Sequence, residues 1–563
     1  MIQTNDKSRF LQALRATRAG YQSEGLLHNF LIDSYTGGGG FQNGLIPSPD
    51  VPLWGRRAYE RQRDNWLEAR SFLSSTPLQG EGAERGEAKR ASQSQWSYLV
   101  AFHGEDQDSY NDRLKNSAYH NPIEKIVRVT NGFLFQTPPV RDNLPELLAR
   151  WVPQVDLKRR HMDSHLRTVG LRMQILGWSG TLVDLPKMQA DNMLDSFRRG
   201  LLPYCMPLYP QEILDMDVSS GGELKSIKIQ TMHEHERSSM LVEKQWEEHI
   251  TIYYPDRWER WRLLLAPPSS RDSGYHDAEF ITPPGSPEYG PNPFGVVPAT
   301  FASWDDGLGG LTSWGMPQIF NLAKIAWQLY NQGSELENIL RNQTFATLVI
   351  PKPEGNSVKG NITIGVGNAI KEPEKAKGLT RYISPSASSA TVYETRLNSG
   401  GERIHAIAGI DSGNGKYSET AEAMRIRFQQ TEMMLINASN ELQRHEQEIL
   451  KLAGRGGFHV SEPELDRIQV FRSKEFDVDR YASQLTEATK AMKLPWPEQV
   501  MTGILKRTVR SVLPNASQKE LAGYDAEIER TMKAVYPKLL SQLLSQIEPD
   551  KTDPAAAPKE QFL

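Results

Sequence analysis

A long helical pattern between residues 418 and 454 constrains the fold of this chain most. Apolar side chains recur there at steps of three and four residues, which is the period of one buried helix face. Ser418 is a favourable N-cap, and Glu419 and Glu422 place negative charge in the first turn. At about 1.5 Å per residue, a helix that ends near Gly454 is roughly 50 Å long and crosses a whole domain. Its apolar positions are Ala421, Met424, Phe428, Leu435, Ala438, Leu442, Ile449 and Leu452.

The length and composition narrow the class of protein. With 563 residues the chain exceeds the size at which one hydrophobic core stops growing, so two or more structural units are expected. A charged fraction of 24% and a hydrophobic fraction of 38% are typical of a soluble globular protein. Residues 1–20 lack the apolar core of a secretion signal, and no apolar run approaches the roughly 20 residues that span a bilayer. No membrane partner is expected.

Cysteine content and net charge exclude several kinds of site. Cys205 is the only cysteine, which rules out internal disulfides and cysteine-clustered zinc or iron–sulfur centres and fits a reducing cytoplasm. The formal net charge of -4 argues against a protein that coats DNA through a positive surface, because such affinity comes from Lys and Arg on phosphates. It does not exclude a protein past which DNA slides.

The first half of the chain predicts an α+β domain. Residues 36–54 and 77–92 are rich in Gly, Pro or charged residues and predict mobile segments, so the compact part is expected to start near Trp96. From Tyr110 to Pro139 the pattern indicates a helix followed by an apolar segment. Strand candidates then follow at Arg172–Leu185, Leu224–Gln230, His249–Tyr254 and Arg260–Leu265.

The second half is mainly helical. A helix is expected from Pro317 to Arg341, and another over Ser389–Ile407, although the pair Gly400 and Gly401 weakens its centre. Between them lie a short strand candidate, Phe345–Ile350, and a loop-rich stretch. The C-terminal part predicts a strand pair near His459 and Phe471, helices around Arg480–Met492, Trp496–Val512 and Gln518–Leu544, and a disordered tail.

Four sequence blocks in this order resemble the portal proteins of tailed bacteriophages, over about Tyr110 to Leu452. The resemblance lies in the order and spacing of the blocks, since each one has a weak signature. The blocks are Tyr110–Leu114 with Tyr119–Pro122 and the apolar segment up to Pro139, then Gly177–Pro186, then Phe320–Asn342, and last a Gly-containing loop before Ser418–Ala423. The Gly- and charge-rich N-terminal inserts depart from the family pattern, and the C-terminal region does not align with it.

The resemblance implies a ring subunit, usually in a dodecamer around a central channel. It assigns 1–95 to an N-terminal arm with mobile inserts, 96–314 to the first part of a wing, 315–342 to a stem helix, 343–388 to a clip, 389–407 to a second stem helix, 408–417 to a tunnel loop, 418–455 to the long wing helix (about 418–453), 456–547 to a helical crown and 548–563 to a disordered tail.

By the same resemblance, the ring replaces one capsid vertex of the virion and conducts DNA during packaging and ejection, after assembly in the host cytoplasm. Its expected partners are the terminase large subunit, which performs the ATP chemistry, major capsid and scaffolding proteins, head-completion or adaptor proteins, and double-stranded DNA bound without sequence preference. The resemblance implies no catalytic residue, metal or cofactor.

Residues near the channel are candidates to face DNA. A channel must guide the duplex without holding it, because each tight phosphate contact is a barrier to movement. The candidates are Arg396 and Arg403 in the second stem helix and Asn414 and Lys416 in the tunnel loop, and Lys416 is the first choice. Alternatively, these are ordinary solvated side chains.

Lysines in the expected clip suggest a polar interface with successive partners. They are Lys352, Lys359, Lys371 and Lys375, with glutamates interspersed. A merely solvated loop has a similar composition.

Enzyme motifs are incomplete in this chain. His161 and His165 have the spacing of a helical metal pair but lack the adjoining Glu, and His233 and His235 alternate as on one strand face without an identifiable third ligand. Cys205 is more typical of a buried small hydrophobe than of a nucleophile. The alternatives to a portal ring are another virion structural protein, such as an adaptor or minor head protein, and an uncharacterised hydrolase with an unrecognised carboxylate pair.

Overall fold

The computed structural model confirms a mixed α+β fold, in which helices make up 56% and strands 19% of the described residues. None of its helices among these residues is long and apolar enough to cross a membrane. The structure describes residues 4–18, 21–38, 41, 97–102, 105, 107–186, 193–235, 246–264, 279–305, 315–344, 347–352, 369–373, 381–383, 388–408, 421–474, 476, 489, 497–512 and 518–547.

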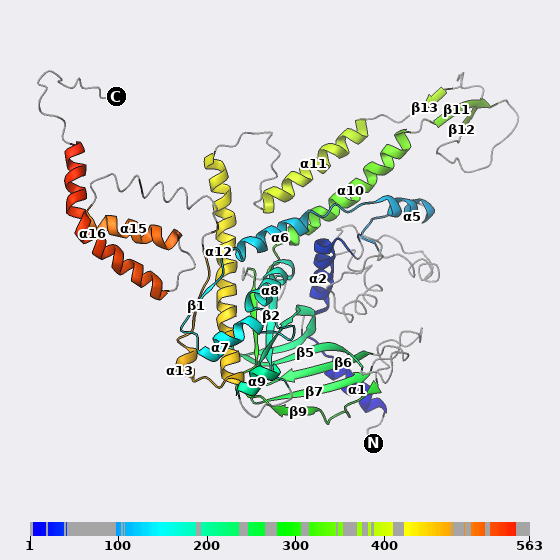
Figure 1. Ribbon diagram of the computed structural model, residues 1–563. Helices are drawn as coiled ribbons and strands as arrows, with labels where there is room; N and C mark the ends of the chain where they lie inside the picture. The colour runs from blue at the N-terminus through cyan, green and yellow to red at the C-terminus, as the bar shows by residue number, and fades with distance from the viewer. Residues whose placement is uncertain are drawn as a thin grey trace, which may run out of the picture.

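The body of the molecule contains a six-stranded antiparallel sheet, in the lower part of Figure 1. Ile227, Ile229 and Tyr253 pack on one face of it, and Ile250 and Trp261 pack on the other. Because both faces are covered, the sheet is part of the core. Its strands are β4 (Ile213–Val218), β5 (Leu224–Glu234), β6 (Trp246–Tyr253), β7 (Arg257–Leu264) and β8 (Glu279–Phe280), with β9 (Glu288–Pro291) paired to β7. The three predicted strands between Leu224 and Leu265 are thus confirmed.

The N-terminal residues are packed, in contrast to the expectation of a compact part that starts near Trp96. Helix α1 (Thr4–Leu14) covers the second face of the sheet with Leu11 and Leu14. Helix α2 (Tyr21–Thr36) buries Phe30 and Leu31 in the helical core. The prediction failed because these two short apolar faces are completed largely by partners far along the chain.

A second antiparallel sheet lies beside the first in the order β10-β2-β3. The segment predicted as strand Arg172–Leu185 is helical up to Leu176, and only its second half is a strand. Gly177 separates the two with a φ of 86°, and a Cβ there would lie 2.5 Å from the carbonyl oxygen of Gly315. The elements are α8 (Met162–Leu176), β2 (Trp178–Asp184), β3 (Tyr204–Leu208) and β10 (Ala299–Ser303).

Helices cover these sheets from above in Figure 1. The apolar segment after Tyr110 is itself a helix, α6 (Pro122–Leu134), whose first two free amides are capped by the side chain of Asn121. Ile123, Ile126 and Val127 of α6 are buried. The remaining short elements of the body are α5 (Gln107–Asn116), α7 (Glu146–Trp151), α9 (Met193–Arg199) and the 3-10 turns Val152–Gln154 and Pro210–Glu212.

A helical hairpin projects from the body toward the upper right of Figure 1. It consists of α10 (Phe320–Thr344) and α11 (Ser388–Ala408), which confirms both predicted helices. Gly400 does not interrupt α11, because it faces α10, where a Cβ would lie only 2.4 Å from Cδ2 of Leu329. A small sheet lies at the far end of the hairpin, with β11 (Thr347–Lys352) parallel to β12 (Ala369–Pro373) and antiparallel to β13 (Arg381–Ile383).

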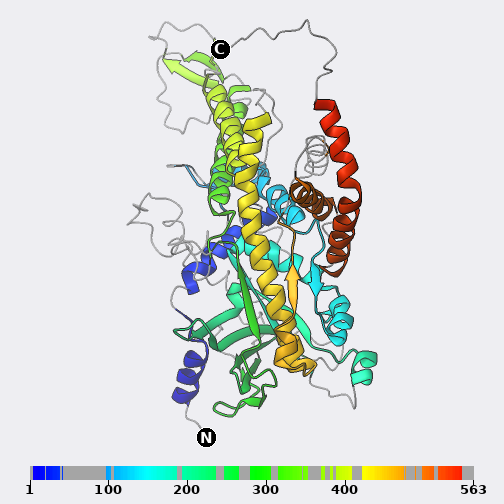
Figure 2. The same ribbon diagram turned by 90° about the vertical axis from the view of Figure 1, so that its left-hand side faces the viewer.

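The long helix α12 (Ala421–Leu452) runs along the body and extends above it, as Figures 1 and 2 show. Leu435, Ala438, Leu442 and Ile449 are buried, so the predicted face is confirmed from Leu435 to Leu452. The side chains of its first part, Ala421, Met424 and Phe428, lie outside the described ones. A single π-helical turn, Ala453–Gly457, ends the helix.

The chain after α12 returns to the body. Strand β14 (Gln469–Phe471) pairs with β1 (Val140–Asp142), so the predicted pair between the His459 and Phe471 regions is wrong. His459 instead lies in a turn with positive φ before α13 (Glu462–Leu465). The local pattern identified a strand at Phe471 but held no information on its distant partner.

Two C-terminal helices lie apart from the sheets, on the left of Figure 1. They are α15 (Glu498–Val512) and α16 (Gln518–Ile547), and both predicted helices are confirmed. Met501 and Met532 are buried there. The helix predicted over Arg480–Met492 and the predicted disordered tail lie outside the described residues, apart from Thr489.

Candidate functional site

The outer face of α11 carries two of the predicted DNA-contact residues. Arg396 and Arg403 are both exposed, and they lie seven residues apart, which is two helical turns or about 10 Å. Val392 and Ile407 extend the same face and are 55% and 49% exposed. The structure therefore brings the two arginines together on one accessible stripe.

Contacts with α10 fix which face of α11 points outward. Ile404 is fully buried in the helical core, and Gly400 lies against Leu329. Tyr393 hydrogen-bonds the Glu335 carboxylate, which raises the pKa of the phenol because a negative charge beside it disfavours phenolate. These three contacts turn one face of α11 toward α10, and both arginines lie on the exposed flank beside that face.

The other predicted contact residues are only partly covered by the structure. Lys416 and Asn414 lie outside the described residues, between α11 and α12. Of the clip lysines, Lys352 ends β11 and Lys371 is the register partner of Ile350 in β12. Lys359 and Lys375 lie outside the described residues.

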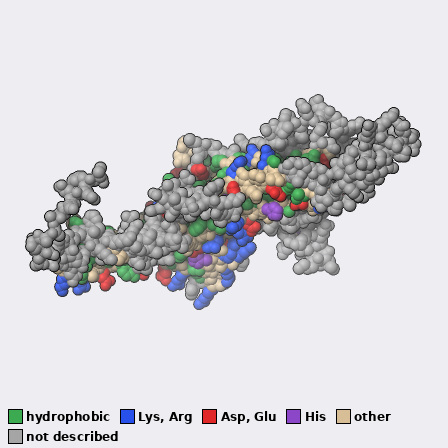
Figure 3. Space-filling model, turned by 90° about the horizontal axis from the view of Figure 1, so that it is seen from above, with side chains coloured by type: hydrophobic (Ala, Val, Ile, Leu, Met, Phe, Trp, Pro, Cys, Tyr) green, Lys and Arg blue, Asp and Glu red, His purple; other side chains and the backbone are tan. Residues whose placement is uncertain are grey.

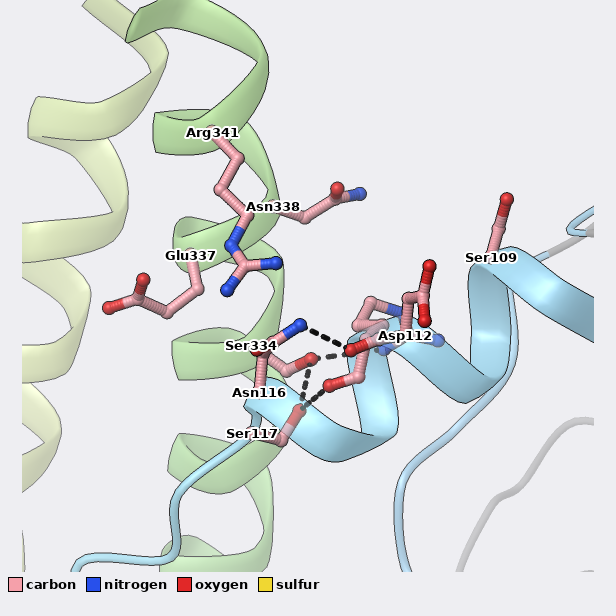
Figure 4. A pocket seen from close by; sticks show the side chains of 9 residues that line it. Ser109, Asp112, Asn116, Ser117, Ser334, Glu337, Asn338 and Arg341 are labelled. Carbon is pink, nitrogen blue, oxygen red and sulfur yellow. Dashed lines mark hydrogen bonds between the residues drawn. The ribbon is translucent and has the colours of Figure 1, made fainter. Parts of the chain in front are cut away.

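A polar hollow lies where α5 meets α10, as Figure 4 shows. Its volume is about 200 Å³, below the roughly 300–1,000 Å³ that small-molecule sites usually have. Ser117 hydrogen-bonds Ser334 across it, and the buried Arg113 guanidinium binds Glu105 at 2.7 Å. Asp112 and Glu337 line the hollow, but Asp112 is largely exposed and pairs with Lys115. This arrangement joins two helices and does not resemble an acid–base pair.

The histidines considered as metal ligands have other partners. His161 caps α8, with Nδ1 accepting from the Asp163 amide, while His165 points into the core toward Thr181. His233 stacks on the ring of His249 with centroids 4.2 Å apart, and His235 hydrogen-bonds Glu247. No group of three or more His, Cys, Asp or Glu residues that could hold a metal occurs among the described residues.

Glu247 is the centre of a charged cluster that sequence reasoning missed. Burial raises the pKa of its carboxyl, but hydrogen bonds from His235, His249 and Arg262 outweigh burial and lower the pKa to about 2. The carboxylate is therefore ionised at all ordinary pH values and is already occupied by donors. The register of the two strands could have revealed this cluster, since Glu247 lies opposite His233 on the neighbouring strand.

Cys205 is buried and has no catalytic surroundings. Burial raises the pKa of its thiol, so the nucleophilic thiolate is disfavoured. The interpretation of Cys205 as a small core residue is confirmed.

Charged side chains of both signs occur on one face of the described part of the molecule. Seen from above in Figure 3, Lys and Arg side chains lie close to Asp and Glu side chains, with small groups of hydrophobic side chains between them. This distribution agrees with the slightly negative net charge.

No model of a known protein family matches the chain, and no curated protein sequence matches it either.

Proposed function

We propose that this chain is the portal subunit of a tailed bacteriophage, which forms a ring at one capsid vertex and conducts DNA during packaging and ejection. The observation that carries the proposal is the projecting hairpin of α10 and α11, with the β11–β13 sheet at its end and the long helix α12 after it. In a portal subunit a two-helix stem projects from an α+β wing and carries a clip at its tip, and the hairpin with its end sheet has the arrangement that this requires.

The exposed face of α11 supports a role in guiding DNA. In a ring, Arg396 and Arg403 would repeat around the channel as two basic levels about 10 Å apart. Isolated basic levels on a protein with a net charge of -4 attract the duplex without the many phosphate contacts that would stop it from moving. Lys416, Asn414 and the loop that holds them supply a third level in this proposal.

The proposed partners divide between the two ends of the hairpin. The β11–β13 module, with Lys352, Lys359, Lys371 and Lys375 in its sequence, would bind the terminase large subunit and later head-completion or adaptor proteins. The wing would contact major capsid and scaffolding proteins. In this proposal the crown consists of α15 and α16. Residues 458–470, which the resemblance also assigned to the crown, are left out of it because they pack into the body against α7 and the lower part of α12.

Two alternatives remain less well supported. A minor head or adaptor protein does not require a projecting hairpin with a separate tip sheet. A hydrolase requires a substrate pocket with catalytic groups, and in the hollow of about 200 Å³ between α5 and α10 the Asp112 carboxylate is largely exposed and pairs with Lys115.

Electron microscopy of the purified protein, with mass photometry, tests the proposal. Closed rings with a channel wide enough for a duplex are expected. A compact monomer or dimer under all assembly conditions would contradict it. We also expect Lys416→Glu to leave the rings intact and to change DNA packaging or retention, and normal packaging by that variant would exclude Lys416 from the channel.

A further inference from the structure

Two buried histidines are linked through one hydroxyl group at the centre of the body. His165 of α8 and His445 of α12 each place Nε2 2.9 Å from Oγ1 of Thr181, which lies on β2. All three side chains have no exposed surface. These contacts therefore join α8, β2 and α12 at a place that is closed to water.

The direction of this hydrogen-bond chain follows from its proton count. Nδ1 of His445 lies 3.5 Å from Oγ1 of Thr300, and the ring also hydrogen-bonds the backbone of Phe301 on β10, a contact that raises its pKa and therefore has the carbonyl as acceptor. With that proton on Nδ1, the neutral ring can only accept at Nε2, so the Thr181 hydroxyl donates to His445. The oxygen of Thr181 then accepts from Nε2–H of His165. Nδ1 of His165 has no hydrogen-bond partner, which agrees with a lone pair at that atom.

A further proton on His445 breaks this hydrogen-bond chain, and a further proton on His165 would lie at Nδ1, where no acceptor is present. If Nε2 of His445 is protonated, the Thr181 oxygen faces two N–H donors and its own proton loses its acceptor. The nearby charges also oppose a second proton. Arg444 and Arg472 lie near His445, and Arg160 and Arg172 lie near His165, where Asp156 is the one opposing charge. Burial, the largest effect, lowers the pKa of His165 to about 4 and holds the pKa of His445 well below its ordinary value.

We propose that His165, Thr181 and His445 form an acid-sensitive latch, which fastens α12 to β2 and α8 while both rings are neutral and releases α12 when they take up protons. The latch is independent of the proposed function. It gives the molecule one defined place at which a fall in pH loosens the long helix before the rest of the body.

The expected size of the effect follows from the ordinary pKa of histidine. An imidazole with a pKa near 6.5 in the open form gains a factor of about 30 in proton binding between pH 7.5 and pH 5.0, while the buried ring gains little. The opening equilibrium of α12 should therefore rise about thirty-fold for each histidine that the opening exposes.

Hydrogen exchange of the full-length chain measures this opening. Amides of Leu435–Leu450 should exchange at least tenfold faster at pH 5.0 than at pH 7.5, after correction for the intrinsic pH dependence of exchange. Helices α15 and α16 contain no histidine and serve as the internal control. His28 is also buried, but it lies on α2, so its protonation would appear at α2 and not at α12.

Variants separate the latch from general acid sensitivity. The double variant His165→Gln and His445→Gln keeps a donor and an acceptor at the Thr181 hydroxyl but cannot titrate, so the acid response of α12 should disappear. Each single variant should lose about thirty-fold of it. Thr181→Val should open α12 already at pH 7.5, whereas Thr130→Val, which removes a buried hydroxyl bonded within α6, should not.

Two results would overturn the proposal. One is exchange of α12 that does not accelerate at pH 5.0 relative to α15 and α16. The other is an acid response that persists in the glutamine variants. If the double variant does not fold at pH 7.5, the single variants decide the question, because each one must show a reduced acid response.

Discussion

At the scale of single residues, the outer arginines of α11 allow a direct test of DNA contact. Replacing Arg396 and Arg403 together by Glu reverses two exposed charges on α11. We expect the free energy of unfolding to change by less than about 0.5 kcal/mol per site, as is usual for exposed positions. The amount of DNA packaged or retained should fall several-fold, because the basic levels become repulsive.

Lys115→Glu is the matched control for this experiment, since Lys115 is 69% exposed but lies on α5. It should package DNA normally. Equal losses in both variants would point to a general effect of charge on the particle and remove α11 from the DNA path.

A buried ion cluster provides a second prediction at this scale. Glu446 of α12 is fully buried and accepts from Arg141 at 2.6 Å and from Arg472 at 2.9 Å. Glu446→Ala leaves the buried Arg472 guanidinium without its carboxylate and Arg141 with Asp163 alone, and should cost roughly 3–5 kcal/mol of unfolding free energy. Urea denaturation measures it.

Glu441→Ala on the same helix removes a carboxylate whose partner, Arg444, is 53% exposed. Its cost should stay below about 1 kcal/mol. A similar cost for both variants would mean that the cluster around Glu446 is solvated.

At the scale of elements, Gly400 and Gly401 form a matched pair on α11. A Cβ at Gly400 would lie 2.4 Å from Leu329, whereas nothing lies within 4 Å of one at Gly401. Gly401→Ala should stabilise the helix by roughly 0.5–1 kcal/mol through helix propensity. Gly400→Ala adds the same propensity but crowds Leu329, so it should be less stable than Gly401→Ala by about 1–3 kcal/mol.

Thermal unfolding of the two variants measures the difference. Adding Leu329→Ala to the Gly400→Ala variant should recover part of the loss, because the smaller side chain makes room. If both glycine variants are equally stabilised, α10 and α11 are not packed closely at this point.

The elements that sequence reasoning predicted best are those whose apolar period is local. The face of α12 follows from steps of three and four residues, and His445 lies on that face between Leu442 and Ile449, a signal that the sequence held but that was not used. Strands β5, β6 and β7 follow from alternation. Arg396 and Arg403 lie seven residues apart, so the helical period places them on one face of α11.

The elements that failed depend on contacts between distant segments. Val140 pairs with Phe471, and no local pattern encodes that register. Gly177 ends α8 because Gly315 approaches its backbone, and Gly400 is required by Leu329 on another helix. Helix α1 buries its apolar face against strands some two hundred positions later, and α2 packs against residues as distant as Ile319 and Leu322.

At the scale of the whole molecule, the hairpin determines how far the tip module reaches from the body. Helix α10 has 25 residues and is therefore about 37 Å long. Strands β11, β12 and β13 pair with one another at its end. Removing them should leave the packing of the body unchanged, which makes a clean deletion possible.

Replacing residues 346–387 by a short Gly-Ser linker tests the proposed division of labour between body and tip. The variant should unfold within about 2 °C of the intact chain and form rings of the same mass, because α10 and α11 retain their contacts. Binding to the terminase large subunit should be lost, as measured by mass photometry of the mixture. The charge variant Lys352→Glu with Lys371→Glu keeps the module and should only weaken binding, more so at low salt, where screening is weakest. Full binding by the deletion variant would mean that the motor docks elsewhere, and loss of rings would mean that the tip holds neighbouring subunits together.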